Sequence, residues 1–170
     1  MRIAVWVLIA WLATSFWTAV ASRLGPAHLL PDCAVIVVAF VALRREPIPV
    51  VLTAVLVGYW VGRQAAAPIG LHETALVLCA IAVYNVSGQL TGSGGLFFAF
   101  VSGSTVIGFH LAVFLLLAWV RGAAGFSSWA TALYLPSAIA TSLLAWVSYR
   151  PMLWLEGRLT VEQREGLQWR

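Results

Sequence analysis

Charged residues are scarce in this sequence. Only 9% of its 170 residues are Asp, Glu, Lys or Arg, whereas 62% are hydrophobic. Soluble domains carry about 25% charged residues, and so few charges cannot cover the surface of a water-soluble fold. The mean hydropathy of +0.93 agrees with this. The expected solvent of the folded chain is therefore lipid.

Lysine is absent, so the formal net charge of +4 comes from arginine alone. The arginines stand singly, or as the one pair Arg44-Arg45, between long apolar runs. A nucleic-acid-binding protein needs basic residues gathered on one face to follow a phosphate backbone. This pattern excludes such a face and instead suits the positive loops of a membrane protein.

Motifs of catalysis and metal binding are missing as well. Cys33 and Cys79 lie within or beside apolar stretches and do not form a CxxC pair, so we interpret them as buried structural thiols. The sequence has no paired carboxylates, no histidine cluster, no GxSxG and no Walker loop. We expect no enzyme activity, no metal and no cofactor.

The apolar runs predict an all-α integral membrane protein with about six transmembrane helices, since a span needs about 20 apolar residues. The expected spans are Ile3 to Ser22, Leu29 to Leu43, Pro47 to Gly62, Leu71 to Leu90, Leu96 to Val120 and Trp129 to Tyr149. The second and third are short, at about 23 Å of helix each. These two either cross the bilayer as short helices or form a partly re-entrant hairpin around Arg44-Arg45-Glu46.

Residues 1–150 are expected to form one transmembrane domain and residues 151–170 a short cytoplasmic amphipathic tail. Thr160 and Gln163 have the spacing of a capping box, which predicts a helix start there. A frayed polar tail is the alternative. Ala19 to Ser22 loosely resembles a signal cleavage site, but the preceding apolar run is long for a signal peptide. We therefore expect the first run to remain as a span.

Six spans place both termini on one side of the membrane, and the positive-inside rule selects the cytoplasm. With that choice the outer side holds Arg23, Arg63 and Arg121 only. The cytoplasmic side holds the remaining arginines, namely Arg2, Arg44, Arg45, Arg150, Arg158, Arg164 and Arg170. The predicted location of both termini is therefore the cytoplasm.

Ionisable residues inside spans are few, and they are candidate functional groups. Asp32 and Glu73 are expected in the first turns of the second and fourth helices, where a carboxylate complements the helix dipole. Counted at 1.5 Å per residue, Asn85 lies closer in depth to His110 than Glu73 does. The predicted pairing is therefore an interhelical hydrogen bond between Asn85 and His110.

Small residues at a spacing of four predict close helix packing. Gly58 and Gly62 form a GxxxG motif, and Ser104 with Gly108 repeats the spacing in the fifth helix. Such packing serves contacts within the chain or with a partner. Pro136 lies inside the sixth apolar run and predicts a kink or a close contact there.

The order of these features resembles MreD, the rod shape-determining membrane protein family of bacteria. The resemblance rests on Leu30-Pro31-Asp32 opening the second helix, and on the Arg44-Arg45 turn followed by Pro47. Gly58 in the third helix and the turn Pro68-Ile69-Gly70-Leu71-His72 before the fourth extend the match over most of residues 1 to 150. An acid often stands in the family pattern where this chain has Gly62.

This resemblance implies a non-catalytic subunit of the machinery that elongates the lateral cell wall. The implied partners are an MreC-like bitopic protein, MreB, RodA and a class B transpeptidase. The implied fold is similar to the substrate-binding subunits of energy-coupling-factor transporters. That similarity supplies the alternative function, a capture subunit or carrier for a small molecule such as a vitamin, whose pocket would use residues such as Asp32, His72, Glu73 and Asn85.

Overall fold

Helices account for nearly all of the part of the chain that the structure describes. The computed structural model describes residues 2–24, 31–44, 46–87, 94–121 and 129–167. Within them lie α1 (Arg2–Leu24), α2 (Cys33–Arg44), α3 (Pro47–Gln64), α4 (Leu71–Ser87), α5 (Gly95–Arg121) and α6 (Trp129–Leu167). The prediction of an all-α fold is confirmed.

Two helices of the described part of the chain are long and apolar enough to cross a membrane. These segments are Ile3–Val20 of α1 and Gly95–Val120 of α5. The apolar helices α2 and α4 are shorter, and the 12 residues of α2 extend over about 18 Å. The length of α2 falls below the roughly 30 Å hydrocarbon core of a bilayer.

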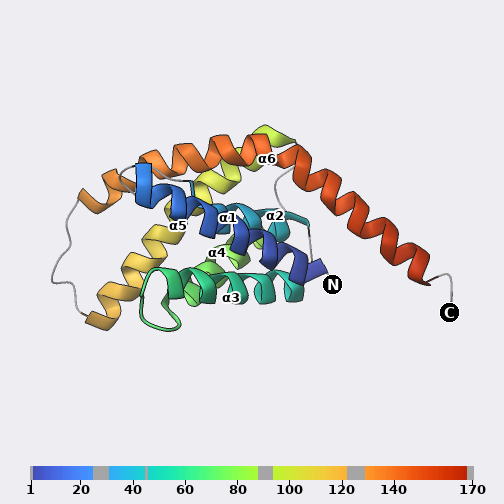
Figure 1. The fold of residues 1–170 in the computed structure, drawn as a ribbon. Coiled ribbons are helices and arrows are strands. Elements are labelled where there is room, and N and C mark those ends of the chain that lie inside the picture. Colours follow the sequence, from blue (N-terminus) through green and yellow to red (C-terminus); the bar gives the residue numbers. More distant parts are fainter. Residues whose placement is uncertain (1, 25–30, 45, 88–93, 122–128, 168–170) are drawn as a thin grey trace.

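Helix α2 is the centre of the molecule. Every residue from Cys33 to Ala42 is buried, and α2 contacts α1, α3, α4, α5 and α6. Figure 1 shows α2 in the interior, with α6 along one edge of the molecule and α3 along the opposite edge. Because its residues are apolar all round, α2 is stable only when neighbouring helices enclose it.

The outward faces of the surrounding helices are also apolar. On α5, Phe100 is 71% exposed and Trp119 is 85% exposed. Leu12 and Phe16 on α1 and Ile48 on α3 are exposed in the same way. A surface with this many large apolar side chains suits lipid better than water.

Polar contacts hold both ends of α2 against α6. The Val35 N–H donates to Asp32 Oδ1 at 3.2 Å, and the Asp32 N–H donates to Thr141 Oγ1 at 2.9 Å. At the other end, the Arg44 guanidinium donates to Glu156 and Tyr149 of α6. Asp32 is therefore the N-cap of α2 and lies just before the first turn in which it was expected.

The helix α6 does not end near Tyr149. It continues to Leu167, with Pro136 and Pro151 inside it. Figure 1 shows that α6 changes direction where its colour passes from orange to red, as proline within a helix explains. The predicted helix start at Thr160 and Gln163 is wrong, because both lie within α6.

Other boundaries differ from the sequence expectations by a few residues. Helix α2 begins at Cys33, so Pro31 lies before its first turn, whereas Pro47 does occupy the start of α3. The expected helix residues 29–30 and 88–90 lie outside the described residues. Gly94 has a φ of 105°, a conformation that favours glycine, directly before α5 begins.

The cap of α2 gives a stability prediction. We expect Asp32→Ala to lower the free energy of unfolding by about 1 kcal/mol, because the Val35 N–H loses its side-chain acceptor. Asp32→Asn keeps an acceptor oxygen and is the matched control. The measurement is an unfolding titration in detergent micelles. Equal stability of the alanine and asparagine variants would contradict the capping role.

Candidate functional site

Gly58 lies at a backbone contact between α3 and α4. A Cβ atom added there would lie 2.6 Å from the Glu73 Cα and 3.0 Å from the His72 carbonyl oxygen. Real side chains do not approach a backbone this closely, so only glycine fits without movement of a helix. The first half of the GxxxG motif therefore serves packing within the chain.

Gly62 faces the same turn of α4 with more room. A Cβ atom added at Gly62 would lie 3.6 Å from the His72 Cβ and 3.8 Å from Glu73 Oε2. The buried atoms His72 Nδ1 and Glu73 Oε2 make no hydrogen bond. Unpaired buried polar atoms cost free energy. Gly62 thus lies beside a small polar site that His72 and Glu73 form.

The start of α4 explains the positions of Gly70 and Glu73. Gly70 has a φ of 92°, and its carbonyl oxygen accepts hydrogen bonds from the Thr74 N–H at 3.0 Å and the Thr74 hydroxyl at 2.6 Å. Gly70 is therefore a turn residue with a conformational role. Glu73 lies in the first turn of α4, as predicted, where its carboxylate complements the helix dipole.

His110 lies beside aromatic rings. Its imidazole stacks on Tyr134 of α6 with 3.9 Å between ring centroids, and the Phe109 ring lies 5.8 Å from that of His72. Among the hydrogen bonds of the described residues, none joins His110 to Asn85. The predicted pairing is wrong because depth was counted from the outer helix ends, whereas the 27 residues of α5 extend beyond the 17 residues of α4 at that side. Residues 109–110 therefore lie near the first turn of α4.

A second glycine contact was not predicted. A Cβ atom added at Gly103 of α5 would overlap the Ser142 hydroxyl and lie 3.3 Å from the Ala138 carbonyl oxygen of α6. Gly103 therefore brings α5 and α6 together as Gly58 does for α3 and α4. The sequence did carry a signal, because Ala138 and Ser142 have the small-xxx-small spacing.

Arg44 belongs to a cluster at the end of α2. Its Nη1 lies 3.4 Å from Glu156 Oε2, its Nη2 donates to the Tyr149 hydroxyl at 3.2 Å, and its guanidinium lies 5.6 Å from the Phe40 ring centroid. The ion pair is partly exposed and is worth little by itself. The cluster fixes where α2 ends against α6, while Arg45 lies outside the described residues.

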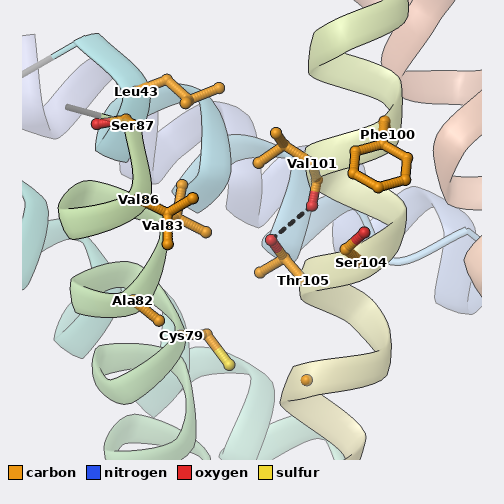
Figure 2. A pocket seen from close by; sticks show the side chains of 11 residues that line it. Leu43, Cys79, Ala82, Val83, Val86, Ser87, Phe100, Val101, Ser104 and Thr105 are labelled. Carbon is orange, nitrogen blue, oxygen red and sulfur yellow. Dashed lines mark hydrogen bonds between the residues drawn. The ribbon is translucent and has the colours of Figure 1, made fainter. Parts of the chain in front are cut away.

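A cavity of about 250 Å³ lies between α4 and α5. Figure 2 shows side chains of α4, such as Val83 and Val86, facing side chains of α5, such as Val101 and Thr105, across it. Leu43 of α2 closes one side. Asp32, His72, Glu73 and Asn85, which the alternative function would use for a ligand, are not among its lining residues.

Within the described ranges, no three His, Cys, Asp or Glu side chains gather closely enough to hold a metal ion. The acidic and histidine side chains that the sequence singled out instead cap helices, begin them or pack against rings. Comparison with protein-family models, curated proteins and solved structures found no match to this chain.

The two glycines of α3 give a matched pair of variants. We expect Gly58→Ala to destabilise the protein by about 1–3 kcal/mol, because its Cβ would overlap the α4 backbone. Gly62→Ala meets only ordinary contacts and also gains helix propensity, so its stability should change by less than about 1 kcal/mol. Unfolding titrations in detergent micelles measure both. Equal effects would contradict the assignment of the close contact to Gly58.

Proposed function

We propose that this chain is a multi-pass protein of the bacterial inner membrane, with all six helices in the bilayer and both termini in the cytoplasm. The apolar outer faces of α1, α3 and α5 support this placement. The excess of arginine on the cytoplasmic side of the proposed topology supports its direction. A fold similar to the substrate-binding subunits of energy-coupling-factor transporters is part of the same proposal.

Contacts at helix ends are compatible with this topology. The end of α2 at Arg44 lies against Tyr149 and Glu156 of α6, and all three belong to the proposed cytoplasmic side. The end of α3 is tied to α1, since the Gln64 side chain donates to the Ser15 hydroxyl at 3.2 Å. The two ends of the bundle are thus each held by their own polar contacts.

We further propose that the chain is a non-catalytic subunit of the cell-wall elongation complex and supports rod shape as MreD-like proteins do. Its partners would be an MreC-like bitopic protein together with MreB, RodA and a class B transpeptidase. The resemblance of Leu30-Pro31-Asp32, of the Arg44-Arg45 turn and of the turn from Pro68 to His72 carries this proposal. The enclosure of α2 is compatible with it, because it leaves the apolar outer faces of the surrounding helices as the surfaces that can contact other membrane proteins.

Capture of a small molecule such as a vitamin is the competing function. It requires a polar pocket, and ligand pockets combine apolar walls with a few placed polar groups. The cavity between α4 and α5 is smaller than the roughly 300–1,000 Å³ of such pockets, and its lining is mostly hydrocarbon. The cavity therefore does not favour small-molecule capture, and the partner experiment below distinguishes the two functions.

Cysteine labelling tests the topology. In a background with Cys33 and Cys79 replaced by alanine, Glu46→Cys should react with a membrane-impermeant maleimide only after the cells are permeabilised. Ala67→Cys, in the turn between α3 and α4, should react in cells whose inner membrane is intact. The opposite pattern would reverse the proposed orientation, and labelling of both positions in intact cells would contradict a complete crossing by α3.

Recovery of partners tests the proposed function. The tagged protein is crosslinked in its own membranes, purified and analysed by mass spectrometry, with an unrelated tagged polytopic protein as control. We expect an MreC-like protein and wall-synthesis enzymes to be enriched over the control. Recovery of an ATPase pair with a coupling membrane subunit, and of no wall enzymes, would overturn the proposal in favour of small-molecule capture.

A further inference from the structure

We propose that the cavity between α4 and α5 binds one acyl chain of an anionic phospholipid from the cytoplasmic leaflet. This inference rests on the membrane placement proposed above. Nothing in the proposed elongation function requires a lipid at this position.

The walls suit a hydrocarbon ligand. Valine, leucine, alanine and phenylalanine side chains dominate the lining. Two of its three hydroxyl groups are already used within their own helices. Ser87 donates to the Tyr84 carbonyl oxygen at 2.7 Å, and Thr105 donates to the Val101 carbonyl oxygen at 2.7 Å. A polar ligand would lose its hydration here and gain few hydrogen bonds in return.

The shape suits a narrow chain. The helices α4 and α5 meet at one end of the cavity, where a Cβ added at Gly108 would lie 3.9 Å from Cys79 Sγ. From Gly108 to Phe100 the cavity follows about 12 Å of α5. Phe100 and Val86 near the other end are 71% and 48% exposed, and Ala82 and Ser104 along the cavity are exposed too, so the cavity opens to the outside of the molecule along its side and at that end. A chain can therefore lie in the cavity from the open end as far as Gly108.

The open end carries positive charge. Leu43 lines the cavity, and the next residue is Arg44, whose side chain is 38% exposed. Its guanidinium has more N–H donors than its contacts with Glu156 and Tyr149 use. In the proposed topology Arg44 lies at the cytoplasmic surface, where arginine attracts anionic lipid headgroups. A phosphate beside Arg44 would place its acyl chain at the mouth of the cavity.

Photocrosslinking tests the site. The full-length protein is reconstituted into phosphatidylcholine vesicles that contain a small fraction of phosphatidylglycerol with a diazirine near the end of one acyl chain. Crosslinked peptides are mapped by mass spectrometry. We expect label on Cys79–Ser87 and Phe100–Gly108 at several times the level on the exposed residues of α1. Even labelling of all lipid-facing helices would overturn the proposal.

Two variants locate the bound chain. Ala82→Phe fills the cavity and should reduce its labelling several-fold, whereas Ile107→Phe adds the same ring to the exposed face of α5 outside the lining and should leave labelling unchanged. Equal labelling in both variants would overturn the site.

A matched phosphatidylcholine probe should label the wild type several-fold less, and Arg44→Gln should remove that preference. Equal labelling of the wild type by both probes would overturn the anionic specificity.

Alkaline extraction of the same vesicles separates this inference from the proposed function. Protein that resists extraction but labels evenly overturns the lipid site alone. Protein that extraction removes overturns the membrane placement and the lipid site together. In native membranes, crosslinks from a bitopic protein to Val83, Val86 and Phe100 that displace the lipid label would assign the cavity to a partner helix instead, which also overturns the lipid site.

Discussion

Helix α2 has to satisfy its polar ends inside a bundle that offers mostly hydrocarbon, and α6 meets this need at both ends. Thr141 accepts a hydrogen bond from the backbone before α2, and Glu156 pairs with Arg44 at its end. Thr141 and Glu156 are about 22 Å apart along α6, which covers the roughly 18 Å between Asp32 and Arg44. The helix α6 must therefore remain helical beyond Arg150, although its sequence becomes polar there.

Close packing on two sides leaves α4 and α5 less tightly joined. Gly58 brings α3 against α4, and Gly103 brings α5 against α6, in both cases through backbone or near-backbone contacts. Between these two pairs, α4 and α5 meet near Cys79 and Gly108 and then separate, with Leu43 at the side of the gap. The cavity thus lies between the two closely packed helix pairs, α3 with α4 and α5 with α6.

The positions of most helices could be predicted from the sequence, because the apolar runs are bounded by arginine, proline or glycine residues. The expected span Leu96 to Val120 agrees with α5, which the structure extends by one residue at each end. Which residues of different helices contact each other could not be predicted in the same way. Depth was counted from the outer helix ends, whereas the 27 residues of α5 extend beyond the 17 residues of α4, so that Phe109 lies beside His72. The GxxxG motif predicted that another helix backbone would pack closely against Gly58, but it did not indicate that this backbone belongs to Glu73.

The contacts of each residue within the chain decide whether it serves internal packing or can bind a partner. Gly58 is enclosed against α4, so a partner lost on its substitution would be lost through a change in the fold. A direct contact in the proposed complex requires an exposed side chain, such as Leu111 or Leu115, which are 51% and 56% exposed. Substitutions at these positions separate the two causes, because they alter the outer face of α5 while leaving the enclosure of α2 intact.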